Sequence, residues 1–135
     1  MLFIIERFSF KLKESISMLN QTQEKGKLME NAVFLHLQKE KAKLSNPYQI
    51  NYWKDYSGNE LDFVIRNSRT INTLINVTNS SSIDEINARE IRALLIASRE
   101  LLCNNLQIVS WDYSNDETLE GKKIKFTPIW RMLFQ

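Results

Sequence analysis

Residues 52–65 read Tyr-Trp-Lys-Asp-Tyr-Ser-Gly-Asn-Glu-Leu-Asp-Phe-Val-Ile, and this stretch decides the fold of the chain. The Ser57-Gly58-Asn59 tripeptide lies between two runs that are rich in aromatic and β-branched residues, a pattern that predicts a β-hairpin. Successive side chains of a strand point to opposite faces of the sheet. We therefore expect Glu60 and Asp62 on one face, and on the other face Leu61, Phe63 and Ile65.

Two carboxylates that leave a turn on one strand face suit a divalent-metal site or an acid/base site. A solvated hairpin explains the same spacing without any function, and the spacing does not decide between the two. Asp62 is the sharper candidate because Leu61 and Phe63 bracket it, and a charge among apolar groups is costly unless it is partnered.

The composition indicates one soluble globular domain. The chain has 135 residues, of which 43% are hydrophobic and 25% charged, as is usual for such a domain. The net charge of +2 is too small to indicate nucleic-acid binding by itself. No apolar run approaches the roughly 20 residues that span a bilayer, so we expect no membrane partner.

The chain has too few cysteines and histidines for several common kinds of site. Cys103 is the one cysteine and His36 the one histidine, so an intrachain disulfide is excluded and a tetrahedral zinc site or a nucleophilic triad has little support. A single cysteine is compatible with a reducing cytosol, and we expect a cytoplasmic protein. The three glycines do not form a phosphate-binding P-loop, so no nucleotide is expected.

Hydrophobic periodicity and turn residues predict a mixed α/β fold. Residues 1–20 fit a strand or a short helix, and this alternative stays open. The Ser82-Ile83-Asp84-Glu85 sequence is a capping box that predicts the start of the second long helix. The expected elements, in the order αβββαββ, are a helix at 26–43, strands at 48–54, 59–66 and 71–79, a helix at 82–102, and strands at 106–111 and 124–128. Residues 129–134 fit a short closing helix.

Four further residues are candidates for a site, each with an ordinary alternative. Glu30 is placed at the edge of the apolar arc of its helix, where a glutamate stem can pack while its head stays in water. Asn76 and Thr78 share the polar face of the third strand, and would face Asp62 if that strand lies beside the second. A solvent-facing position is the favoured reading for both. Lys54, before the hairpin turn, could help to bind phosphate but is usually only solubilising.

Five segments together resemble a known family. They are Gly26–Leu35, Tyr52–Val64, Leu74–Val77, Arg89–Leu94 and Lys122–Trp130. They resemble the C-terminal domain of prokaryotic AAA-type ATPases, which looks like a member of the PD-(D/E)xK, restriction-endonuclease-like superfamily. The resemblance implies a nuclease-like domain at 23–135. It also implies that residues 1–22 are an arm, similar to the connection upstream of that domain, without the ATPase module.

The resemblance also implies roles for individual residues. Glu30 matches the helix acid, Asp62 matches the central metal-ligand aspartate, and the third-strand Glu-x-Lys falls on Asn76-Val77-Thr78. In active members the carboxylates hold Mg²⁺, which polarises the scissile phosphate and activates water, and the lysine stabilises the developing charge. Asn76 lacks the negative charge of the expected glutamate, and Thr78 lacks the positive charge of the expected lysine. The implied site is therefore a remnant catalytic site, formed by Glu30, Asp62, Asn76, Thr78 and Lys54. If the site binds Mg²⁺, we expect Asp62, Glu30 and Glu60 to be its ligands.

Three functions follow from this pattern. The first is a catalytically degraded nuclease-like domain that binds DNA or a protein partner. The second is an active Mg²⁺-dependent DNA endonuclease in which Glu60 and Lys54 have taken over the missing roles. The third is a pure interaction domain, regulatory or homodimerising, associated with an ATPase.

Overall fold

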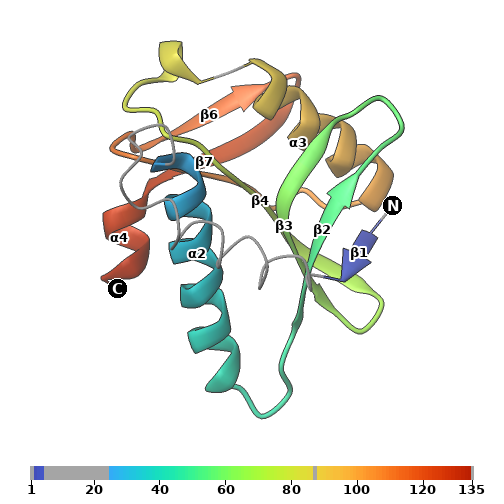
Figure 1. Ribbon diagram of the computed structural model, residues 1–135. Helices are drawn as coiled ribbons and strands as arrows, with labels where there is room; N and C mark the ends of the chain where they lie inside the picture. The colour runs from blue at the N-terminus through green and yellow to red at the C-terminus, as the bar shows by residue number, and fades with distance from the viewer. Residues whose placement is uncertain (1, 5–24, 87, 135) are drawn as a thin grey trace.

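The computed structural model describes residues 2–4, 25–86 and 88–134 (Figure 1). In chain order, the elements are β1 (Leu2–Ile4), α2 (Lys25–Ala42), β2 (Gln49–Lys54), β3 (Glu60–Asn67), β4 (Thr70–Val77), the 3-10 turn η2 (Ile83–Glu85), α3 (Ala88–Leu101), β5 (Leu106–Ser110), β6 (Asn115–Leu119), β7 (Lys122–Pro128) and α4 (Ile129–Leu133). The predicted mixed α/β class is confirmed. Most of the predicted arm lies outside the described residues.

One mixed sheet carries the fold, with seven strands in the order β1-β2-β3-β4-β5-β7-β6. The strands from β1 to β4 pair antiparallel, β4, β5 and β7 run parallel, and β6 returns antiparallel at the edge. The carboxyl ends of the three parallel strands therefore meet at one edge of the sheet. No helix in the described part of the chain combines the length and hydropathy needed to cross a bilayer.

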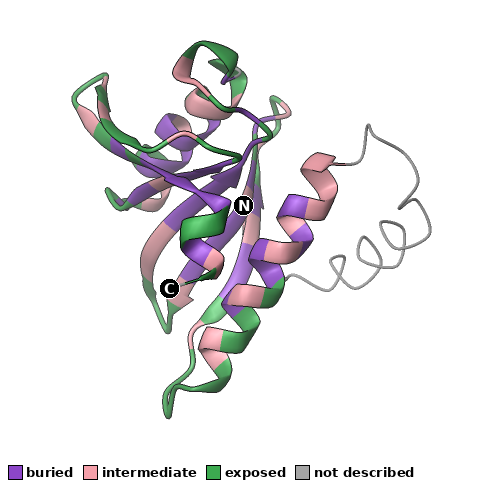
Figure 2. Ribbon diagram, turned by 90° about the vertical axis from the view of Figure 1, so that its left-hand side faces the viewer, coloured by how far each residue is buried: buried purple, intermediate pink, exposed green. Residues whose placement is uncertain are grey.

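Helices cover both faces of the sheet, so the domain has two hydrophobic cores (Figure 1). On one face, α2 and α4 pack through residues such as Val33, Phe34 and Met132. On the other face, α3 packs through Leu94 and Ala97. Figure 2 shows the strands buried over much of their length, while α2 becomes more exposed towards its C-terminal end.

A bulge in β3 changes the predicted alternation of its side chains. Asn51 pairs with Val64 and Trp53 with Leu61, so one residue of β2 lies opposite two residues of β3. The strand therefore changes face within this interval. Leu61 and Val64 belong to the core under α3, whereas Phe63 and Ile65 belong to the core under α2. Our expectation that Leu61 shares a face with the latter two is wrong.

Two other local predictions differ from the structure. The capping box does not start the long helix: Ser82 makes no side-chain cap bond, and the segment forms η2 before α3 begins at Ala88. The Glu85 carboxylate instead accepts a hydrogen bond from the backbone N–H of Ser81 at 2.8 Å. The strand β6 was not predicted because its sequence, Asn-Asp-Glu-Thr-Leu, has no apolar alternation. It is a polar edge strand that depends on pairing with β7.

Candidate functional site

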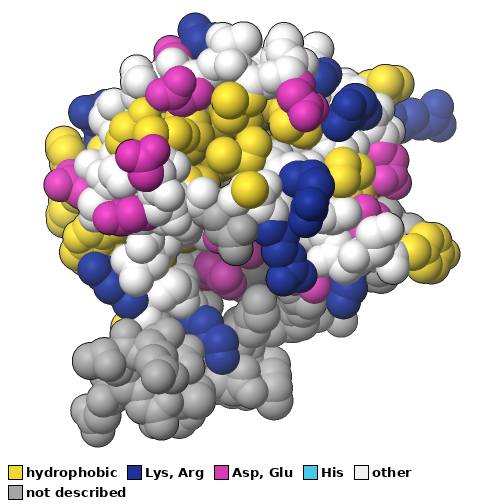
Figure 3. All heavy atoms as spheres, turned by 90° about the horizontal axis from the view of Figure 1, so that it is seen from above, with side chains coloured by type: hydrophobic (Ala, Val, Ile, Leu, Met, Phe, Trp, Pro, Cys, Tyr) yellow, Lys and Arg dark blue, Asp and Glu magenta, His cyan; other side chains and the backbone are white. Residues whose placement is uncertain are grey.

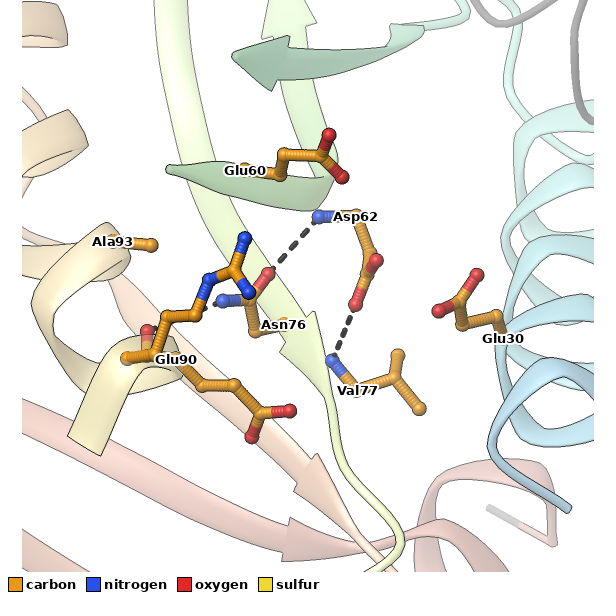
Figure 4. Close-up of a pocket in the computed structure, with 8 residues that line it drawn as sticks. Glu30, Glu60, Asp62, Asn76, Val77, Glu90 and Ala93 are labelled. Carbon is orange, nitrogen blue, oxygen red and sulfur yellow. Dashed lines mark hydrogen bonds between the residues drawn. The ribbon is translucent and has the colours of Figure 1, made fainter. Parts of the chain in front are cut away.

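A pocket of about 290 Å³ opens at the point where β3 and β4 separate. The ladder between these strands extends to Phe63 opposite Ile75 and stops there. Beyond it, α2 contributes a side chain from one side and α3 from the other (Figure 4). The lining residues are Glu30, Glu60, Asp62, Asn76, Val77, Arg89, Glu90 and Ala93.

Side chains replace the backbone ladder at the mouth of this opening, which we call the fork (Asp62, Asn76 and Val77). The backbone N–H of Asp62 donates to Oδ1 of Asn76 at 3.0 Å. The backbone N–H of Val77 donates to Oδ2 of Asp62 at 2.8 Å. Because each strand supplies an acceptor to a backbone donor of the other, the two strands stay connected beyond the end of the backbone ladder.

Both the oxygen and the nitrogen of the Asn76 side-chain amide form hydrogen bonds. Its Oδ1 accepts from Asp62, and its Nδ2 donates to the backbone oxygen of Glu90 at 3.2 Å. A backbone N–H requires an acceptor and a carbonyl requires a donor, so these partners fix the orientation of the amide. Asn76 thus ties the first turn of α3 to the sheet. It is only 3% exposed, so the expectation of a solvent-facing position is wrong for this residue.

Thr78 lies beyond the fork and does not line the pocket. It is 6% exposed, which also contradicts a solvent-facing position. Its hydroxyl shares a 2.9 Å hydrogen bond with the hydroxyl of Ser80, and it also bonds to the carboxylate of Glu90. Thr78 therefore stabilises the segment after β4 and supports a pocket residue from behind.

Glu90 is a pocket residue that the sequence analysis missed. It lies in the first turn of α3, and its Oε2 atom is buried without a hydrogen-bond partner. Burial raises the pKa of Glu90 above its ordinary value; the hydrogen bond from Thr78 opposes this shift and the charge of Glu30 adds to it. A signal was present in the sequence, because Glu90 interrupts the apolar stripe that includes Leu94 and Ala97.

The other predicted site residues lie around the same opening. Glu30 projects from α2 towards Asp62 (Figure 4). Glu60 lines the pocket and forms an ion pair with Lys54, with 3.2 Å between Oε1 and Nζ, while Lys54 itself stays outside the lining. Arg89 supplies the positive charge of the lining and donates to the backbone oxygen of Gly58 at 3.1 Å, which links α3 to the hairpin turn.

The pocket is strongly acidic, with four carboxylates and one guanidinium in its lining. Figure 3 shows acidic side chains inside a hollow and basic side chains beside it. Within the described residues, no three His, Cys, Asp or Glu side chains are arranged to hold a metal ion. The oxygen of Asn76 and one oxygen of Asp62 already accept backbone hydrogen bonds. These two hydrogen bonds use part of the acceptor capacity of the two residues that the resemblance places at a metal site.

The chain matches a known protein family. Residues 25–132 match the family described as "Domain of unknown function (DUF4143)". No curated protein and no solved structure matches the chain.

Proposed function

The chain belongs to the DUF4143 family, and we propose that its domain is a restriction-endonuclease-like fold that has lost metal-dependent cleavage and acts as a DNA-binding module. The observation that carries the loss of cleavage is the double use of the Asn76 amide, between Asp62 and the Glu90 backbone. The observation that carries binding is a pair of exposed tryptophans, each with a cation against its ring: Lys25 at Trp111 and Arg131 at Trp130.

The replacement at position 76 is more than a lost ligand. An active member of the superfamily that this chain resembles places a carboxylate on the third strand to hold the metal. Here a carboxylate would point one of its oxygens at the backbone oxygen of Glu90, where only a donor is favourable. The fork has therefore been rebuilt around an amide, and the first turn of α3 depends on that amide.

The missing lysine fits the same account. Thr78 matches the lysine position, and its hydroxyl, which does not line the pocket, bonds to Ser80 and to the lining residue Glu90. Lys54, a candidate to replace it, forms an ion pair with Glu60. The cation of the lining, Arg89, donates to the backbone oxygen of Gly58, and no lysine stands at the matched position to stabilise the charge that develops on a phosphate during cleavage.

One observation favours an active nuclease as the second candidate. Glu30, Glu60, Asp62 and Glu90 all line one pocket, and a modest side-chain movement could bring some of them together around Mg²⁺. In that case Arg89 or Lys54 would have to stabilise the scissile phosphate. This candidate requires cleavage that depends on both the metal and Asp62.

Cleavage of supercoiled plasmid and of branched DNA with Mg²⁺ or Mn²⁺ tests the proposal. We expect the wild-type protein and Asp62→Ala to be equally inert. Asp62→Asn is the folded control, because it keeps an acceptor for the Val77 N–H. Metal-dependent nicking by the wild type that both variants lose would overturn the proposal and establish the second candidate.

The resemblance to ATPase C-terminal domains leads us to propose an ATPase module as a protein partner, which is the alternative to DNA. DNA binding measured against salt separates the two. Phosphate contacts give a log–log slope of about −0.9 per neutralised phosphate of duplex DNA. Absence of binding at low salt would remove DNA as the ligand and leave the protein partner.

A further inference from the structure

Two tryptophans are exposed at one edge of the sheet. Of the three in the chain, Trp53 is fully buried, whereas Trp111 is 43% and Trp130 is 49% exposed. Exposing the apolar surface of an aromatic ring to water is unfavourable. Two exposed tryptophans that lie close together therefore indicate a binding surface.

Both indoles leave the sheet at the carboxyl ends of neighbouring parallel strands. Trp111 directly follows β5, and Trp130 lies in the first turn of α4, directly after β7. The last residues of those strands, Ser110 and Pro128, are paired in register. The indole N–H of Trp130 donates to Oδ1 of Asp112 at 3.0 Å. The ring of Trp130 is thereby tied to the residue next to Trp111.

A cationic side chain lies against each of the two indole rings. Nζ of Lys25 lies 3.5 Å from the centre of the Trp111 ring, and the guanidinium carbon of Arg131 lies 5.3 Å from the centre of the Trp130 ring. Arg131 also donates to the hydroxyl of Ser114 at 2.8 Å, which restrains it. The acid within this group, Asp112, already accepts the indole hydrogen bond.

Lys25 links the tryptophan pair to α2, the helix that supplies Glu30 to the acidic pocket. Lys25 begins α2, five residues before Glu30, which is a rise of about 7.5 Å along the helix axis. The carboxylates of the pocket repel phosphate, whereas Lys25 and Arg131 attract it. A nucleic-acid backbone is therefore favoured along the tryptophans and disfavoured inside the pocket.

We infer that Trp111, Trp130, Lys25 and Arg131 form a platform that binds single-stranded nucleic acid. As bases stack on the indole rings, they displace the two cations from the rings to the phosphates. Stacking together with phosphate contact is the combination by which single strands are held without sequence readout. Duplex DNA hides its base faces and cannot use the rings in this way. This inference deepens the proposed function and rests on it, because the same side chains carry its DNA-binding part.

Quenching of tryptophan fluorescence by an oligo(dT) single strand tests the platform in the full chain. At low salt we expect saturable quenching, with the emission of buried Trp53 retained. Trp111→Leu and Trp130→Leu should each weaken binding about tenfold. Lys25→Ala and Arg131→Ala should each make the log–log salt slope shallower by about 0.7. Circular dichroism of each variant shows whether it has folded.

Tyr56→Leu is the matched control, because this aromatic side chain is 94% exposed on the hairpin turn and should bind as the wild type does. Absence of quenching, or equal affinity in the wild type and both tryptophan variants, would overturn the platform. Binding of duplex DNA alone would also overturn it, yet would leave the proposed function standing. Metal-dependent cleavage would overturn the proposed function without touching the platform.

Discussion

Asp62 and Asn76 are joined across the fork by a hydrogen bond from the backbone N–H of Asp62 to Oδ1 of Asn76, 3.0 Å long. The Asp62 carboxylate in turn accepts from the backbone N–H of Val77. The two residues at the centre of the implied catalytic site are thus also the residues that connect the strands where the backbone ladder ends. Substituting either residue should therefore lower the stability of the domain. Substituting a metal ligand that makes no structural hydrogen bond would not have this effect.

Asn76→Asp should destabilise the domain by about 2 to 3 kcal/mol at neutral pH, because it removes the donor to Glu90 and buries a charge near other carboxylates. Urea denaturation measures the change. Asn46→Asp, in an exposed loop, is the control and should change stability by less than about 0.5 kcal/mol. Equal effects at the two positions would mean that the amide of Asn76 is not a brace.

Asp62→Ala should cost about 1 to 3 kcal/mol, since it leaves the backbone N–H of Val77 without an acceptor. Asp62→Asn keeps an oxygen in place and relieves repulsion among the pocket carboxylates, so it should cost less than about 1 kcal/mol. Denaturant midpoints of the two variants give the comparison. Equal losses would show that the charge of Asp62, and not its role as an acceptor, stabilises the fork.

Glu90→Gln should stabilise the domain at neutral pH. The pKa of Glu90 is raised in the folded protein, mainly by burial, so the folded state binds a proton more tightly than the unfolded chain does. The stability of the wild type therefore falls as the pH rises from the ordinary glutamate pKa, about 4.3, through the raised value. The gain from Glu90→Gln should appear over this window and vanish below it.

Thermal unfolding of the wild type and Glu90→Gln from about pH 4 to pH 8 measures this dependence, over a range that starts near the ordinary glutamate pKa. The same substitution at the exposed Glu100 of α3 is the control, and it should show no comparable growth with pH. A constant difference between wild type and Glu90→Gln at every pH would mean that ionisation of Glu90 is not what destabilises the pocket.

Leu102→Gly should stabilise the domain by up to about 1 kcal/mol. Leu102 directly follows α3, has a φ of 53° and is 90% exposed. A left-handed residue at this position suits glycine, and little packing is lost on removing the side chain. Leu44→Gly, at an exposed leucine without a positive φ, should be neutral or destabilising. A lower melting temperature for Leu102→Gly would contradict this reading of the helix end.

Elements set by local sequence could be predicted. The Ser57-Gly58-Asn59 turn, the first helix and the alternating strands follow from turn residues and periodicity, which depend only on near neighbours. The predicted helix at 26–43 corresponds to α2 at Lys25–Ala42, and the hairpin strands agree within a residue or two.

Features set by strand pairing could not be predicted. The bulge opposite Tyr52 and the burial of Asn76 and Thr78 under α3 depend on which strands and helices meet, and period two alone does not contain that information. Glu90 could have been found, because a glutamate within an apolar helical stripe requires an explanation. Its unpartnered buried oxygen became visible only in three dimensions.

Calorimetric titration of the wild type with Mg²⁺, with Asp62→Ala as the comparison, tests the central claim most directly. If the hydrogen bonds of the fork have replaced a metal site, millimolar Mg²⁺ should give no saturable heat and the two titrations should coincide. A saturable isotherm in the wild type that disappears in a folded Asp62→Ala protein would show that Asp62 holds a metal ion, and the account of a rebuilt fork would be wrong.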